Sequence, residues 1–229
     1  MIPLKWLAIL TGVLPLVTLL VSYLVAASYG LVSWCVPIWD GCTTISATGR
    51  HPPSSLIFKG AMIPSALVIF TFWFFSFFWL KQLGLGRVTT RTLMLIFGLA
   101  SAVFLVLYTV ALGHIGAEYR ILRRIGVILF YAFTLIAQTM MISMLWPKRQ
   151  LFTAPGSRYS ISLVVASNVM LAVTGIINLV IQKVHPGLQW LENVVEWDFT
   201  IVLCLNFIWI SRLWSVSKYS LTPQCILPK

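Results

Sequence analysis

The sequence is poor in charged residues, and acidic residues are especially rare. Only 9% of the 229 residues are charged, with five Asp and Glu against sixteen Lys and Arg, whereas 59% are hydrophobic. A soluble fold has too little interior to hide this much apolar surface, so a water-soluble globular protein is excluded. The bases are spread along the chain, whereas a nucleic-acid-binding surface needs them clustered on one face. We therefore also exclude nucleic acid as a partner.

Motifs that indicate the common classes of enzyme and metal site are missing as well. The sequence has no glycine-rich phosphate-binding loop, no kinase motif and no HxxxH, HxH or CxxC pattern. It contains no Asn-x-Ser/Thr sequon and no internal repeat. We therefore predict no metal site and no cofactor.

Six long apolar stretches dominate the sequence. A helix that crosses the hydrocarbon core of a bilayer needs about 20 mostly apolar residues. The windows that meet this length are residues 7–27, 60–80, 93–112, 126–145, 161–181 and 199–217. They predict an all-α integral membrane bundle of six transmembrane helices, a single domain over residues 1–229 with no room for a soluble second domain. The first stretch is long for a cleavable signal peptide, so we expect it to remain as a signal anchor.

The charges divide unevenly between the two sides of such a bundle. One side receives ten bases and no acid: Lys5, Lys81, Arg87, Arg91, Lys148, Arg149, Arg158, Arg212, Lys218 and Lys229. The other side receives Arg50, Lys59, Arg120, Arg123, Arg124 and Lys183 with all five acids and all three histidines, so the net charges are +10 and +1. Because bases near span ends favour the cytoplasm, we predict that both termini are cytoplasmic. Every acidic or imidazole group then faces the outer or lumenal side.

The first outer connector, about residues 29–59, is the longest. Its glycines and prolines predict an ordered, turn-rich cap without a helix: Gly30, Pro37, Gly41, Gly49, Pro52 and Pro53. Cys35 and Cys42 also lie here, and an oxidising compartment is compatible with either a short-loop disulfide or two free thiols.

Two further features lie within the spans. Phe70–Trp79 reads FTFWFFSFFW, and we expect this run to face lipid and anchor the helix at the interface. The amides of Gln138, Asn168, Asn178 and Asn206 predict interhelical hydrogen bonds. A channel or transporter is disfavoured, because a transport pathway more often shows buried charge or broken helices at the midplane.

The acidic residues before the last span are the main candidates for chemistry. Glu192 and Glu196 lie one helical turn apart with Asp198 nearby, and like charges at this spacing repel unless a cation or a proton lies between them. Their candidate partners are Lys59, Arg120, Arg123 and Arg124. One interpretation is an ion-pair network between outer helix ends. The other is a lipid headgroup pocket, with bases for phosphate and acids for hydroxyls or amines.

If the protein is an enzyme, the candidate catalytic groups are the histidines and two of these acids. They are His51, His114, His185, Glu196 and Asp198. An enzyme requires at least one of the histidines to lie within hydrogen-bond reach of an acid.

The segment from Ile45 to Phe58 resembles the first-loop signature of the DRAM/Sfk-type membrane proteins, which are related to the GPI-anchor remodelling membrane proteins. Their pattern is roughly I-S-[DA]-T-G-x-x-P-P-E-x-x-I-F, and it is matched by Ile45, Ser46, Thr48, Gly49, Pro52, Pro53, Ile57 and Phe58. Glu196-Trp197 resembles a Glu-Trp pair that opens the last span in this family. The chain departs from the pattern at Ala47 and Ser54, and it has Arg123 and Arg124 where a histidine is usual.

The resemblance implies a protein of lipid and membrane homeostasis, acting in autophagy and lysosomes, in plasma-membrane lipid organisation or in GPI-anchor maturation. It would be a multi-pass protein of the lysosomal or endomembrane system or of the plasma membrane, with membrane lipids as partners. Our leading hypothesis is a lipid-binding regulator that holds a headgroup on its outer side. The alternative is a membrane-embedded lipid hydrolase or acyltransferase, and a channel or transporter is third. Protein partners and oligomeric state stay open.

Overall fold

The computed structural model of the chain describes residues 2–152, 156–185 and 187–221. Lys229, one of the ten bases on the basic side, lies outside the described residues. We call the two ends of the bundle outer and cytoplasmic, as the charge distribution predicts.

Six helices of the described residues are long and apolar enough to cross a membrane, which confirms the predicted class of fold. Their bounds are α1 Lys5–Ser28, α4 Ser54–Gln82, α5 Val88–Ala111, α6 Ala117–Leu145, α7 Ser157–Val184 and α8 Gln189–Val216. A short 3-10 helix, η1 (Trp146–Leu151), follows α6. Most of these helices extend beyond the apolar windows, because polar residues at their ends continue the helix into the headgroup layer. Helix α8, for example, begins ten residues before the window at residue 199.

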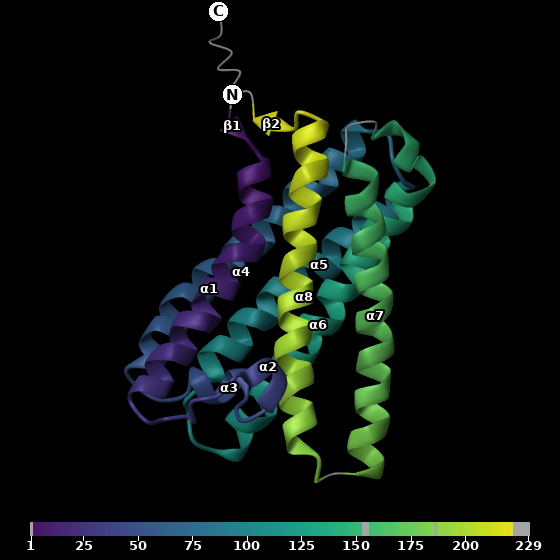
Figure 1. Ribbon diagram of the computed structural model, residues 1–229. Coiled ribbons are helices and arrows are strands. Elements are labelled where there is room, and N and C mark those ends of the chain that lie inside the picture. Colours follow the sequence, from purple (N-terminus) through teal and green to yellow (C-terminus); the bar gives the residue numbers. More distant parts are fainter. Residues whose placement is uncertain (1, 153–155, 186, 222–229) are drawn as a thin grey trace, which may run out of the picture.

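The closest backbone packing of the six helices follows a ring, and side chains of α8 also reach across it to α4 and α6. The order around the ring is α1, α4, α5, α6, α7 and α8, and α8 closes it against α1. Figure 1 shows α7 at the edge of the bundle, beside α8. Helix α7 packs mainly on α8 and approaches α6 more loosely.

The expectation that the aromatic run of α4 faces lipid is wrong for three of its eight aromatic side chains. Phe72, Trp73 and Trp79 are buried, and Phe72 stacks on Trp214 and meets Phe207 edge to face, both from α8. Since α4 turns 100° per residue, a run this dense covers the core face as well as the lipid face. Only part of the run, such as Phe70, Phe74 and Phe78, is exposed.

Two of the four amides within the spans form the expected interhelical hydrogen bonds. Asn206 of α8 donates to the side-chain oxygen of Gln138 in α6 at 2.8 Å, and it accepts a hydrogen bond from Ser167 of α7 at 2.6 Å. This network joins three helices near the middle of the bundle. The expectation is wrong for Asn168, whose carboxamide has no hydrogen-bond partner, and for the Oδ1 atom of Asn178.

The first and last described segments of the chain pair at the cytoplasmic end of the bundle (Figure 1). Strand β1 (Ile2–Pro3) pairs antiparallel with β2 (Ser220–Leu221). Just beyond α8, Tyr219 donates to the carbonyl oxygen of Phe75 at 3.0 Å, and Trp79 donates to Ser217 at 2.9 Å. The segment after α8 is thereby fixed to α4.

The first outer connector is ordered, but the prediction that it lacks helix is wrong. It contains two single-turn helices, α2 (Pro37–Asp40) and α3 (Ile45–Thr48). Pro37 begins α2, where its missing N–H is not needed, and Gly41 ends it in the left-handed conformation. Thr44 caps α3 by accepting the amide of Ala47 at 2.9 Å. We call residues 29–53 the cap.

Candidate functional site

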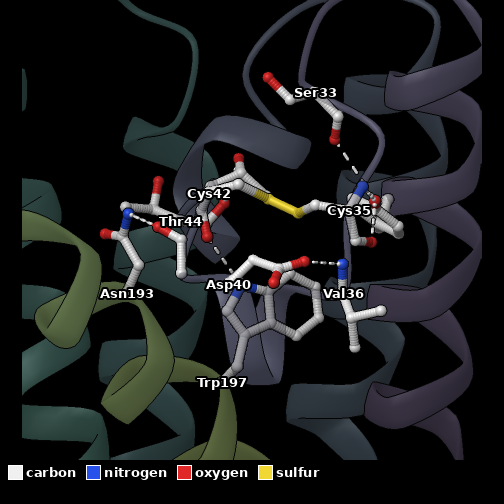
Figure 2. Close-up of a disulfide and its surroundings, with 11 residues drawn as sticks. Ser33, Cys35, Val36, Asp40, Cys42, Thr44, Asn193 and Trp197 are labelled. Carbon is white, nitrogen blue, oxygen red and sulfur yellow. Dashed lines mark hydrogen bonds between the residues drawn. A yellow bond between two sulfur atoms is a disulfide. The ribbon is translucent and has the colours of Figure 1, made fainter.

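The cap is anchored to the outer end of α1. Cys35 and Cys42 form a disulfide across α2, and Asp40 accepts the amide of Val36 at 2.8 Å inside the same loop (Figure 2). The hydroxyl of Tyr23 in α1 accepts a hydrogen bond from the backbone amide of Cys35 at 2.9 Å. It also donates a hydrogen bond to the carbonyl oxygen of Cys35 at 2.7 Å. The disulfide-bonded loop is therefore held over α1 by one buried tyrosine.

Helix α8 binds the other side of the cap. Asn193 donates to the carbonyl oxygen of Gly41 at 2.7 Å, and the indole of Trp197 donates to the carbonyl oxygen of Thr43 at 3.0 Å. Figure 2 shows Asn193 and Trp197 on the side of the loop that faces α8. The approach is so close that a Cβ on Gly41 would lie 2.0 Å from the carbonyl oxygen of Trp190.

The segment that carries the family signature forms the floor of the cap. Ile45 is buried, and Ser46 shares a hydrogen bond of 2.9 Å with the hydroxyl of Tyr108 in α5. Gly49 lies against the ring of Phe58, which leaves no space for a Cβ. Thr48 is buried and donates to the carbonyl oxygen of Ile45. The remaining signature residues lead into α4: Pro52 and Pro53, joined by a cis peptide bond, and the partly buried Ile57.

Glu196 lies where the cap meets α8. Its carboxylate accepts the amide of Ile45 at 3.3 Å, and its side chain is partly buried. One turn further along α8, Thr200 donates to the carbonyl oxygen of Glu196 and shares a hydrogen bond with the hydroxyl of Tyr131 in α6. A carboxylate and a set of hydroxyl groups thus gather beneath the cap from α3, α5, α6 and α8.

An apolar cavity extends from this polar layer into the bundle. Only about 30 Å³ of it is open to the centre of a water-sized sphere, which is room for about one small group. Ile45 and Tyr108 line its outer part, and Pro15, Ile69 and Phe207 line its deeper part. The cavity is lined almost entirely by apolar side chains, and charges next to such surroundings interact more strongly than in water.

The acids and bases of the outer side do not form the ion-pair network that the sequence allows. Within the residues that the structure describes, no carboxylate forms an ion pair with a Lys, Arg or His side chain. Glu192 and Asp198 are exposed on α8, and Arg120 and Arg124 are exposed on α6. Arg123 instead donates to the carbonyl oxygen of His114 at 3.0 Å, in the turn between α5 and α6.

Three bases nevertheless lie near the polar layer, around the outer end of α5. Arg50, Arg123 and Glu196 all lie within electrostatic range of the Tyr108 hydroxyl. The ammonium group of Lys59 lies near Gly113 of the same turn, at 4.0 Å from the position of a Cβ there. An acid and three bases therefore surround the outer end of α5 without direct pairing.

The histidines do not join this group. His51 and His185 are exposed, and His114 stacks on Tyr119 with ring centroids 4.9 Å apart. None of the three forms a hydrogen bond with Glu192, Glu196 or Asp198. No group of three or more His, Cys, Asp and Glu side chains among the described residues could hold a metal ion.

Several residues of the site are missing from the sequence-based candidates. Tyr108, Tyr131, Thr200 and Asn193 complete the polar layer and the contact with the cap. Tyrosines near span ends usually indicate interface anchors, so their type and position do not distinguish these two. The sequence signal that points to them is a set of hydroxyl and amide side chains in the outer halves of α5 and α8 and in the middle of α6.

Six membrane-spanning helices under a disulfide-bonded outer cap define a multi-pass integral membrane protein. Residues 3–212 match the family described as Frag1/DRAM/Sfk1/Cwh43P N-terminal domain. The match covers most of the chain, and the protein belongs to this family. No curated protein and no solved structure is significantly similar to it.

Proposed function

We propose that the protein is a lipid-associated regulator of membrane lipid homeostasis, and that its outer side binds a lipid headgroup between the cap and the outer ends of α5 and α8. The observation that carries the proposal is the Glu196 carboxylate. It is partly buried, it accepts one backbone amide, and it forms no ion pair within the described part of the chain. Removing a charge from water without a partner is costly, so a ligand with a positive or hydrogen-donating group would stabilise it.

The charges around Glu196 favour a headgroup that combines phosphate with an amine or hydroxyl group. Arg50, Arg123 and Lys59 supply positive charge on the α4 and α5 side, and Glu196 supplies negative charge on α8. Guanidinium and ammonium groups bind phosphate, whereas a carboxylate accepts from ammonium or hydroxyl donors. A zwitterionic phospholipid matches both.

In this proposal, the acyl chains of the phospholipid lie in the surrounding bilayer and not in the central cavity. The open space of about 30 Å³ is too small for a chain unless the side chains that line it move. The apolar side chains around the cavity instead make the inner side of the polar layer a medium of low polarity, which strengthens the attraction of Glu196 for a cationic group.

The test is native mass spectrometry of the protein extracted from its own membranes. We expect one retained class of zwitterionic lipid with the wild-type protein and about ten-fold less of it with Glu196→Gln, the loss of one charge-assisted hydrogen bond. Gln keeps the acceptor for the amide of Ile45 but removes the charge. The matched control is Glu192→Gln, one turn earlier on α8 and exposed, which should retain the lipid.

The two variants separate a specific site from a general effect of charge. Equal retention by wild type and Glu196→Gln would contradict the proposal, provided that both variants reach the membrane and unfold at the same temperature. Equal loss with both variants would show that the charge of the outer surface, and not the group beneath the cap, attracts the lipid.

A further inference from the structure

A second cavity lies between α6 and α7, away from the cap. Its volume is about 170 Å³, and it is lined by Thr139, Ile142, Val165, Asn168, Val169 and Ala172. Thr139, Val169 and Ala172 are exposed on the surface of the bundle, so the cavity opens sideways toward the lipid. It lies along the seam where α7 approaches α6 only loosely.

Two polar residues line this cavity: Thr139 donates to the carbonyl oxygen of Leu135, whereas the side chain of Asn168 has no hydrogen-bond partner. Only 5% of the residue is exposed, and neither its Nδ2 nor its Oδ1 atom forms a hydrogen bond. The neighbouring Ser167 points the other way and donates to Asn206. An amide that is buried without a partner costs about 1–3 kcal/mol in folded proteins. The buried carboxamide of Asn168 therefore has an unpaired donor and an unpaired acceptor.

The depth of Asn168 in the membrane restricts which kind of ligand can occupy the cavity. Trp146 and Tyr159 lie near the cytoplasmic ends of α6 and α7, and aromatic residues of this kind mark the interface. Asn168 follows Tyr159 by nine residues, which is roughly 13 Å along the helix. In a core about 30 Å thick, this position is close to the midplane. A charged or zwitterionic headgroup is too costly at that depth.

We propose that the cavity between α6 and α7 binds a neutral lipid with a hydroxyl group. The hydroxyl donates to Oδ1 of Asn168 and accepts from its Nδ2, and the hydrocarbon chain lies against Ile142, Val165 and Val169. A neutral hydroxyl offers both the donor and the acceptor that the carboxamide lacks. A neighbouring transmembrane helix fits less well, because Asn168 lies at the floor of the cavity and Val169, which is 59% exposed, projects at its rim.

The test uses the full-length protein in liposomes with two photoactivatable probes. One probe is a long-chain alcohol with a diazirine in its chain, and the other is its methyl ether. We expect the alcohol to label peptides with residues 139–142 or 165–172 about five-fold more than the ether, the ratio for a hydrogen bond of average strength. Asn168→Leu should abolish this preference.

Asn178→Leu is the matched control, the same exchange ten residues further along α7. It should leave the preference for the alcohol unchanged. Equal labelling by the two probes, or a preference that survives Asn168→Leu, would overturn the proposal. A crosslink between two copies that depends on Asn168 and not on the alcohol would also overturn it, in favour of a helix as the occupant.

If Asn168→Leu does not fold, Ala172→Leu replaces it. This change fills the cavity from its exposed rim, and it should reduce labelling at residues 139–142 and 165–172 by both probes. Unchanged labelling in Ala172→Leu would place the probes elsewhere and would contradict the proposal.

Discussion

At the scale of single residues, the contact between the cap and α8 depends on Gly41. Its φ of 57° is in the left-handed region, and a Cβ would lie 2.0 Å from the carbonyl oxygen of Trp190. For Gly41→Ala we expect a loss of about 2–4 kcal/mol in the free energy of unfolding, because the strain of the backbone and the separation of the cap from α8 add together. Chemical or thermal unfolding of the purified protein in detergent measures this loss.

Gly30→Ala is the control for Gly41→Ala. Gly30 has a φ of 67°, and nothing lies within 4 Å of its Cβ position. The control therefore carries the backbone cost alone, about 1–2 kcal/mol. If the two variants lose the same stability, the close approach of Gly41 to Trp190 does not contribute to the stability of the cap.

The sequence predicts some residues of the candidate site and not their grouping. Glu196 can be recognised from the sequence as a candidate site residue, because an ionisable side chain at the end of a membrane span is costly to bury. Its contact with Ile45 joins residues separated by 151 positions, and no charge or periodicity links the two. Tyr108 and Thr200 are missed for a related reason, because their hydroxyls matter only through the neighbours that folding brings to them.

At the scale of helices, the hydrogen-bond network of Asn206 ties α8 to α6 and α7. Asn206→Leu leaves the oxygen of Gln138 without its donor and the hydroxyl of Ser167 without this acceptor. We expect a loss of about 1–2 kcal/mol in the free energy of unfolding, at the upper end for polar contacts between transmembrane helices. Reversible unfolding of the protein in mixed detergent micelles measures it.

Asn178→Leu provides the comparison for Asn206→Leu. The side-chain oxygen of Asn178 is buried without a hydrogen bond, so its replacement removes no interaction and should be neutral or slightly stabilising. Equal destabilisation by the two variants would mean that Leu is poorly accommodated at both positions, and that the network itself adds little.

Composition predicts where the membrane-spanning helices lie better than it predicts which side of each helix is buried. Hydropathy places all six spans, because a membrane imposes the same length requirement on each. It does not show which side of an apolar helix is buried, since lipid and protein core are equally apolar. The aromatic run of α4 is therefore misassigned, with Trp73 and Trp79 in the core. The cap helices α2 and α3 are missed because single turns depend on local caps such as Thr44 and Gly41.

At the scale of the whole molecule, the two sites lie in different parts of one bundle. The polar layer beneath the cap lies at the outer ends of α5 and α8 and beside the middle of α6, and Asn168 is near the middle of α7, toward the cytoplasmic side. Helix α7 contributes no residue to the central cavity. A change in the seam between α6 and α7 can therefore reach the outer site only through α6 and α8, which carry Tyr131 and Thr200.

The orientation of the bundle decides which compartment the Glu196 site faces. With ten bases and no acid on one side, and a net charge of +1 on the other, we predict that the termini are cytoplasmic and that the cap is outer or lumenal.

The test of this orientation uses single cysteines at two exposed positions, His114 between α5 and α6 and Thr89 in the first turn of α5, in a chain with Cys225→Ser. In sealed vesicles with the cytoplasmic side outward, a membrane-impermeant maleimide should label Thr89→Cys at once. It should label His114→Cys only after permeabilisation. The reverse pattern would place Glu196 and the cap in the cytoplasm, where the reducing environment disfavours the Cys35–Cys42 disulfide, and the headgroup site would then face the inner leaflet.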